Sequence, residues 1–139
     1  TVPVGKVSKE ATALMKATKK ALERAVKAAK VGNTTGDIGH AVESYVKPLG
    51  YGIVRILSGH GVGYSVHEDP YIPNYGRRGT GEKLVAGMVI AIEPMLNLGT
   101  EDVCVTDDEY TYITEDGKIS AHFEHTVAIT EKGPIILTK

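Results

Sequence analysis

The chain of 139 residues has 42% hydrophobic and 24% charged residues and a net charge of −1, values typical of one globular domain with a buried core. Its single cysteine, Cys104, excludes an internal disulfide and fits a reducing compartment. No run approaches the roughly 18 apolar residues of a membrane span and no secretory leader is present, so we expect a cytoplasmic protein without a membrane partner.

The first predicted element is a helix over residues 9–31. Ser8 is a suitable N-cap, apolar residues recur at helical spacing, and Gly32 follows as a stop. Residues 1–30 carry eight Lys or Arg against two Glu. They lack the interleaved aromatics of a nucleic-acid surface and are typical of the solvated face of a helix. Nucleic acid is therefore not an expected partner.

A second helix is predicted after Thr34, with Asp37 placed for a capping box and Pro48 as the end. Beyond it the pattern changes to β structure. Strands are predicted at 53–57, 88–95, 103–105, 110–114, 119–129 and 135–137. The Asp116-Gly117 pair predicts a hairpin between two of them. Two helices followed by strands indicate an α+β class, with helices on one face of a largely antiparallel sheet.

The stretch SGHGVGYSVHEDPYIPNY, residues 58–75, holds two histidines among glycines and prolines. His60 lies between glycines, and Glu68 and Asp69 directly follow His67. A glycine cluster usually marks a turn or a close approach of the main chain to another group. Taken alone, the stretch leaves open both a surface turn with incidental histidines and a functional site.

Two glutamates occupy positions that are otherwise typical of buried strands. Glu93 follows the apolar run 88–92, and Glu124 lies within 119–129, on the same predicted strand face as His122. A buried carboxylate must be protonated, paired with a cation or bound to a metal.

Three interpretations of these carboxylates compete. A glycosidase-like carboxylate pair is disfavoured, because the chain has no tryptophan and few aromatic residues to stack on a sugar. A metal site of one imidazole and two carboxylates would suit Mn, Fe, Co or Zn. In the third interpretation the carboxylates form ordinary ion pairs with the basic first helix.

The motifs SGHGVGYSVHEDP, IEPM and FEHTVAIT, in this order and at this spacing, resemble the C-terminal half of a type I methionine aminopeptidase. The resemblance runs the whole length and implies the pita-bread (creatinase/aminopeptidase-like) fold, in which both halves supply metal ligands. Residues 1–139 would form its C-terminal half, two helices packed on a largely antiparallel sheet. The sequence opens with TVPVG rather than Met, and we expect it to be a piece of a longer chain whose N-terminal half lies outside it.

The resemblance implies roles for four residues. His60, Glu93 and Glu124 would be metal ligands, with Glu124 bridging two divalent ions (Co, Mn, Fe or Zn). His67 and Glu93 would be catalytic, His67 by contacting the substrate carbonyl and Glu93 by taking the proton of the nucleophile and passing it toward the leaving amine. The glycines beside His60 would let the main chain pass close to the metal and substrate.

The sequence also departs from the family pattern. Val66 and Tyr110 align with the Phe and Trp that commonly line the methionine pocket and, with His67, are the implied substrate-binding residues. His122 stands where Gln is common. Two aspartate ligands would come from the N-terminal half, so the chain alone is expected to be inactive.

The implied function is metal-dependent removal of N-terminal methionine from nascent proteins and peptides. The implied partners are a peptide with an N-terminal Met, the N-terminal half and, in the intact protein, the ribosome. Two alternatives remain. A proline-specific pita-bread peptidase, a prolidase or aminopeptidase P, typically has Gly rather than Met95 after IEP, and a non-catalytic pita-bread binding module would have lost ligands.

Overall fold

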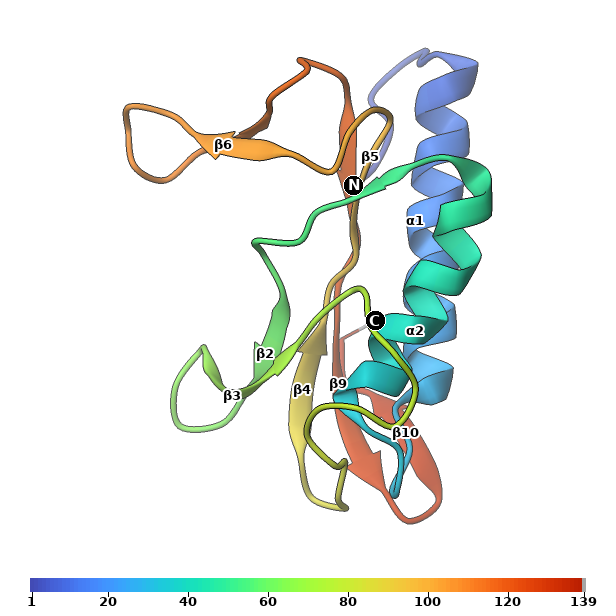
Figure 1. Ribbon diagram of the computed structural model, residues 1–139, viewed down its shortest axis with the longest axis vertical. Helices are drawn as coiled ribbons and strands as arrows, with labels where there is room; N and C mark the ends of the chain where they lie inside the picture. Colours follow the sequence, from blue (N-terminus) through green and yellow to red (C-terminus); the bar gives the residue numbers. More distant parts are fainter. Residues whose placement is uncertain (139) are drawn as a thin grey trace.

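The computed structural model describes residues 1–138, in which two helices cover one side of a set of antiparallel sheets (Figure 1). Helices α1 (Lys9–Ala28) and α2 (Thr35–Val46) pack against each other, and α2 continues into the short 3-10 helix η1 (Lys47–Leu49). The strands are β1 (Gly52–Ile53), β2 (Gly59–Gly61), β3 (Glu68–Ile72), β4 (Val89–Ile92), β5 (Met95–Asn97), β6 (Val103–Val105), β7 (Tyr112–Thr114), β8 (Ser120–His122), β9 (His125–Thr130) and β10 (Gly133–Ile136). This arrangement confirms the predicted α+β class.

The strands form three sheets in which every pairing is antiparallel. The strand orders are β10-β9-β4-β2-β3, β1-β5-β8 and β6-β7. Two segments of chain run through both larger sheets, because β4 is followed at once by β5 and β8 at once by β9. In the first sheet β4 pairs with β9, and in the second β5 pairs with β8. The β6-β7 hairpin extends away from the helices (Figure 1).

Apolar side chains of both helices and of the sheets form one core. α1 packs on β4, β5 and β8, and α2 packs on β3. Fully buried members include Leu14, Ile38, Val42, Ile90, Ile92, Leu96, Val127 and Ile129. Burying each such side chain stabilises the fold by about 1.5–3 kcal/mol relative to leaving it in water. The core therefore anchors the central strands β4 and β9 on the helical side and leaves the other side of the sheets open. None of the helices in residues 1–138 combines the length and apolar character that crossing a membrane would require.

The helix starts are those that the sequence predicts. The Ser8 hydroxyl accepts a hydrogen bond of 3.1 Å from the amide of Ala11. Thr34 and Asp37 form a capping box, in which each side chain accepts from the other residue's amide. The first helix ends three residues before the predicted 31, because the side-chain amide of Asn33 donates to the carbonyl of Ala28 at 2.8 Å and replaces the next helical turn.

Several strand predictions need correction. The predicted strands 88–95 and 119–129 are each two strands, and of 53–57 only Ile53 lies in one. The interpretation of 58–75 as a mere surface turn is wrong, since β2 and β3 both lie within it. Glycine and histidine obscure the alternating pattern of these strands, whose pairing depends on main-chain hydrogen bonds to neighbours far along the chain.

The predicted hairpin at Asp116-Gly117 is also wrong. The turn forms, with Gly117 at a φ of 69° and its amide bonded to the carbonyl of Thr114 at 3.1 Å. The strands on its two sides belong to different sheets, however, because β7 pairs with β6 and β8 pairs with β5. The turn therefore redirects the chain from the projecting hairpin back to the body of the molecule.

Candidate metal centre

The two glutamates singled out by the sequence lie at interruptions in the strands rather than inside them. Ile92 of β4 is paired with His125, and Met95 of β5 is paired with His122, so two residues on each segment lie between the two ladders. Pro94 contributes to the break because it has no amide hydrogen to donate to a ladder. The two interruptions face each other, since the amide of Phe123 donates to the Pro94 carbonyl at 3.4 Å.

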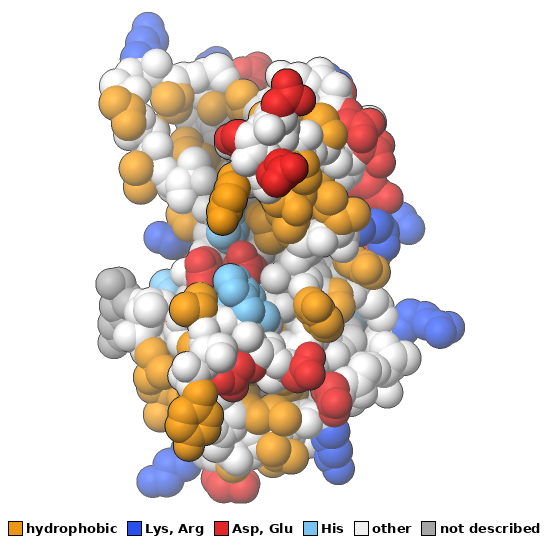
Figure 2. Space-filling view, turned by 90° about the vertical axis from the view of Figure 1, so that its left-hand side faces the viewer, with side chains coloured by type: hydrophobic (Ala, Val, Ile, Leu, Met, Phe, Trp, Pro, Cys, Tyr) orange, Lys and Arg blue, Asp and Glu red, His pale blue; other side chains and the backbone are white. Residues whose placement is uncertain are grey.

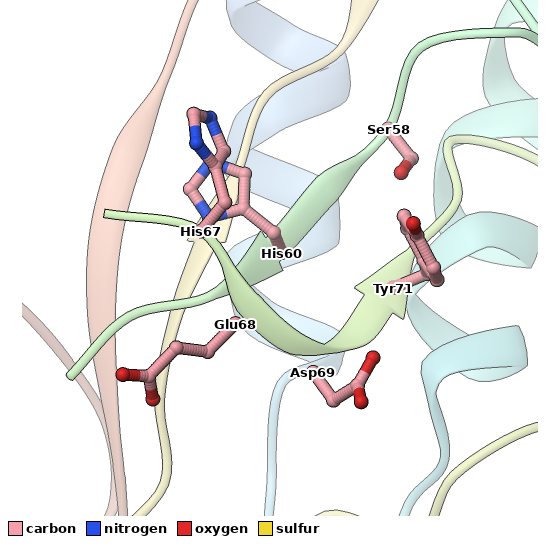
Figure 3. Close-up of a pocket in the computed structure, with 6 residues that line it drawn as sticks. All are labelled: Ser58, His60, His67, Glu68, Asp69 and Tyr71. Atoms are coloured by element: carbon pink, nitrogen blue, oxygen red, sulfur yellow. The ribbon is translucent and has the colours of Figure 1, made fainter. Parts of the chain in front are cut away.

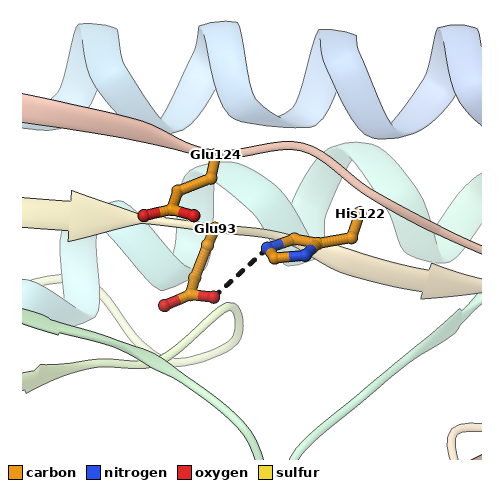
Figure 4. Close-up of side chains that lie close together, drawn as sticks. All are labelled: Glu93, His122 and Glu124. Atoms are coloured by element: carbon orange, nitrogen blue, oxygen red, sulfur yellow. Dashed lines mark ion pairs between the residues drawn. The ribbon is translucent and has the colours of Figure 1, made fainter. Parts of the chain in front are cut away.

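Glu93 sits at the centre of the resulting cluster. Its side chain is 14% exposed, and its two oxygens face two imidazoles. Oε1 lies 3.4 Å from Nε2 of His60, and Oε2 lies 3.2 Å from Nε2 of His122, the pair joined by the dashed line in Figure 4. Figure 4 also shows the Glu124 carboxylate beside that of Glu93. One donor atom from each of Glu93, His122 and Glu124 lies within 4.8 Å of the others.

A neighbouring carbonyl indicates which ring nitrogen of His60 carries the hydrogen. Its Nδ1 lies 2.9 Å from the carbonyl oxygen of Gly61, which can only accept, so Nδ1 carries the hydrogen. In the neutral ring Nε2 then presents a lone pair toward Oε1 of Glu93. At 3.4 Å from Oε1, such a lone pair can share a bound cation with the carboxylate.

The donors in this cluster fit a divalent cation. Carboxylate oxygens and an imidazole nitrogen are the ligands preferred by Mn, Fe, Co and Zn. The predicted ion pair with the basic first helix is wrong for Glu93, because the ion-pair partners the structure gives it are His60 and His122. Glu124 is exposed rather than buried in a strand, so its oxygens are accessible from the open side of the sheets.

A hollow of about 450 Å³ adjoins the cluster and contains the second histidine of the glycine-rich stretch. The rings of His60 and His67 lie 4.2 Å apart between centroids, at 61° to each other. The hollow is lined by Ser58, His60, His67, Glu68, Asp69 and Tyr71 (Figure 3). The two carboxylates that follow His67 point away from both rings in Figure 3. Glu68 instead accepts a hydrogen bond of 2.6 Å from the amide of Ser65, so Glu68 supports the loop rather than the histidines.

The cluster lies on an open face of the molecule, where groups from outside residues 1–138 have room to contact it. Figure 2 shows histidine and acidic side chains gathered in a crease across the middle of the face turned away from the helices, with hydrophobic side chains above and below. Two of the predicted substrate-binding residues, Val66 and Tyr110, are 74% and 87% exposed. Neither is among the described residues that line the hollow, so their assignment to a methionine pocket stays a prediction.

The glycines beside His60 allow close strand packing, while their expected role near metal and substrate stays a prediction. A Cβ on Gly59 would overlap the carbonyl oxygen of Ala91 in β4, and a Cβ on Gly61 would overlap that of Asp69 in β3. β2 lies between these two strands. The glycines therefore allow neighbouring main chains to approach, which fixes His60 on β2 opposite Ala91.

Two residues of the cluster were missed as partners of Glu93. The sequence predicts His122 on the same strand face as Glu124, but it does not predict the contact of His122 with Glu93. Asn74 donates from its side-chain amide to the main-chain carbonyl of Glu93 at 3.2 Å. Nothing in the sequence marks Asn74, because the contact joins residues 19 apart through the fold.

Comparison with known proteins adds to this geometry. The sequence profile of metallopeptidase family M24 matches residues 1–131. A methionine aminopeptidase from Clostridium acetobutylicum is 49% identical over 138 residues, 99% of this chain and 55% of that protein. The crystal structure of the methionine aminopeptidase from Thermotoga maritima is 46% identical with a TM-score of 0.95, covering 98% of this chain and 55% of that one. A prolidase from Pyrococcus furiosus is 34% identical with a TM-score of 0.76, covering 99% of this chain and 35% of that one.

These likenesses confirm the predicted pita-bread fold. They also show how much of a relative the chain covers. The chain spans about half the length of the curated relatives it matches. The identity and the TM-score are both higher for the methionine aminopeptidase than for the prolidase.

Proposed function

The chain belongs to metallopeptidase family M24, and we propose that it forms the C-terminal half of a catalytic domain that removes N-terminal methionine from proteins and peptides. The observation that carries the proposal is the placement of Glu93, which meets Nε2 of His60 at 3.4 Å beside the exposed carboxylate of Glu124. The choice of methionine over proline substrates is supported by the higher identity to methionine aminopeptidases and by Met95 after the IEP motif.

In this proposal His60, Glu93 and Glu124 hold divalent metal ions, with Glu124 shared between two of them. The remaining ligands, two aspartates, come from the N-terminal half of the longer protein, so residues 1–139 alone do not turn over substrate. When bound, such ions would supply a water of lowered pKa and would polarise the scissile carbonyl. The choice among Co, Mn, Fe and Zn is left to measurement.

The side chains of this chain divide the remaining work. Glu93 accepts the proton of the attacking water and returns it to the leaving amine, as suits a carboxylate that is 14% exposed and has an imidazole nitrogen close to each oxygen. His67 is exposed at the edge of the hollow, where a ring N–H can donate to the substrate carbonyl oxygen. His60, whose Nδ1 is fixed by Gly61, keeps Nε2 directed at Glu93.

We further propose a cytoplasmic protein that meets its substrates at the ribosome, where the N-terminal methionine of a nascent chain first becomes accessible. Co-sedimentation of the full-length protein with translating ribosomes tests this. Recovery of equal amounts with and without ribosomes would overturn the association.

The function is tested with the full-length protein, assayed on Met-Ala-Ser and on Gly-Pro after treatment with a chelator and after return of Co or Mn. We expect hydrolysis of Met-Ala-Ser that disappears with the chelator and returns with metal, together with bound metal measured by mass spectrometry. Preference for Gly-Pro would replace the proposal with a proline-specific peptidase. Absence of both turnover and bound metal would replace it with a non-catalytic module.

A further inference from the structure

Arg55 connects three segments of the chain that are far apart in the sequence. It lies between β1 and β2, on the segment that leads to His60. Its Nε donates to Oε2 of Glu101 at 2.8 Å, and its Nη2 donates to Oε1 of Glu43 on α2 at 3.4 Å. Its guanidinium also lies over the ring of Tyr75, with Cζ 4.4 Å from the ring centroid. Two carboxylates and an aromatic face therefore fix the orientation of this planar group.

The loop after β3 is held directly against α2. The Gly76 amide donates to Oε2 of Glu43 at 3.1 Å, so Glu43 binds this loop with one oxygen and Arg55 with the other. A Cβ on Gly39 of α2 would overlap the carbonyl oxygen of Tyr75, which shows that the two main chains are in contact. Arg55 thus holds this loop in two ways, through the Tyr75 ring and through Glu43.

The residue before Tyr75 reaches the candidate metal centre. Asn74 is 1% exposed, and its side-chain nitrogen donates to the carbonyl of Glu93 at 3.2 Å. The side-chain oxygen of Asn74 accepts no hydrogen bond from residues 1–138. The position of the Asn74 amide therefore depends on the main chain of the loop, which Arg55 and Glu43 hold.

We infer that Arg55 is a positioning residue for Glu93, on which it acts through Tyr75 and Asn74. The inference rests on the proposed function, in which Glu93 is a metal ligand. Without Arg55 the loop after β3 would be held less tightly on α2, and the Asn74 amide would support the Glu93 carbonyl less well. The main chain between β4 and β5 would then move more, and its carboxylate would be less preorganised for a metal ion. Groups that orient a metal ligand directly change metal affinity by about 10- to 100-fold, and a group that acts through another should change it less.

In the competing interpretation Arg55 belongs to a surface ion-pair cluster that has no effect on the site. Its side chain is 40% exposed, and those of Glu43 and Glu101 are 26% and 47% exposed, so these pairs alone should contribute little stability. The two roles differ in their dependence on Asn74. Positioning requires that loss of Arg55 has no further effect once the Asn74 side chain is removed, whereas the effects of independent groups add.

The test uses the full-length protein and the variants Arg55→Gln, Arg55→Lys, Asn74→Ala and the double variant Arg55→Gln/Asn74→Ala. Hydrogen exchange of segments 73–77 and 93–97 is measured by mass spectrometry without metal, Mn affinity by titration calorimetry, and the unfolding midpoint in urea. The control is Arg24→Gln, which removes a second arginine stacked on a tyrosine, with Cζ 5.3 Å from the ring centroid of Tyr45 on α2.

We expect Arg55→Gln to speed hydrogen exchange in both segments and to weaken Mn binding by about 3- to 10-fold. Arg55→Lys should do the same, because an ammonium group lacks the planar fork that meets both carboxylates and the ring. The double variant should bind Mn as Asn74→Ala does. Arg24→Gln should match the wild type in the exchange of both segments and in Mn affinity.

Different outcomes decide this inference and the proposed function. A wild type that binds no Mn and leaves Met-Ala-Ser intact would overturn the proposed function, and exchange of segment 93–97 would still decide whether Arg55 positions Glu93. Unchanged exchange of that segment in Arg55→Gln, with or without a lower urea midpoint, would overturn the role of Arg55. So would a double variant that binds Mn more weakly than Asn74→Ala by the factor measured for Arg55→Gln alone.

Discussion

The side-chain amide of Asn74 donates a hydrogen bond of 3.2 Å to the main-chain carbonyl of Glu93. Asn74 is 1% exposed and lies in the loop after β3, whereas Glu93 lies between β4 and β5. The contact therefore fixes the main chain at the point where the strand pairing is interrupted. A carboxylate at such a break needs this support, because the ladder no longer holds its backbone.

Replacing Asn74 tests that support. Asn74→Ala in the full-length protein should lower the free energy of unfolding by about 1–3 kcal/mol, because the partly buried carbonyl of Glu93 loses its donor. It should also weaken metal binding, because the Glu93 backbone is released. Asn97→Ala is the matched control, since Asn97 is equally buried but donates to Thr100 at 2.9 Å, and it should cost stability without changing metal affinity. Equal metal affinity in both variants would show that Asn74 is only a packing residue.

The strands around His60 lie close together, so we expect two nearby glycines to differ in how well they tolerate replacement by alanine. Gly61→Ala should lower the free energy of unfolding by about 1–3 kcal/mol and reduce metal binding, because the new Cβ would overlap the Asp69 carbonyl and push β3 from β2. Gly63→Ala meets only the end of the Glu68 side chain, which can move, and should stay within about 0.5 kcal/mol of the wild type. Urea unfolding of the two variants measures the difference, and equal stability would contradict the packing argument.

Glu124 is the residue for which a structural role and a metal role predict opposite results. It is exposed, so Glu124→Gln in the full-length protein should leave the free energy of unfolding within about 0.5 kcal/mol of the wild type. If Glu124 bridges two metals, the same variant should lose turnover of Met-Ala-Ser and bind less metal. Glu131→Gln, an exposed glutamate in the turn between β9 and β10, should do neither. Retained turnover together with retained metal stoichiometry would decide against the bridging role.

The capping box of α2 predicts a pH dependence of stability. Hydrogen bonding from the backbone of Thr34 holds the pKa of the Asp37 carboxyl below its ordinary value. Because the folded pKa is depressed, Asp37 contributes stability above its unfolded pKa of about 3.9, and the contribution is lost as the pH falls through the lower folded value. Asp37→Ala should therefore cost about 1 kcal/mol at pH 7. The gap to the wild type should narrow below about pH 4. Urea unfolding at several pH values measures this gap, with the exposed Asp107→Ala as a control, and a gap that widened on acidification would contradict the capping role.

The helices of this protein and the prominence of Glu93 were determined by interactions between residues close together in the sequence. The caps at Ser8 and Thr34 and the apolar spacing of both helices are local, so the sequence predicted the helices and their starts. Glu93 was conspicuous for a local reason as well, since a carboxylate after an apolar run demands a partner wherever the strand is placed. The family motifs added His60 and Glu124 as candidates in the same way.

The partners of that carboxylate were decided only by tertiary structure. The facing interruptions at Pro94 and Phe123 exist because β4 pairs with β9 while β5 pairs with β8, a register set between segments about 30 residues apart. The same pairing brings His122 to Oε2 of Glu93, and the loop after β3 brings Asn74 to its carbonyl. Hydrogen bonds between distant strands leave no periodic trace in the sequence, because the main-chain groups that form them are the same at every residue except proline.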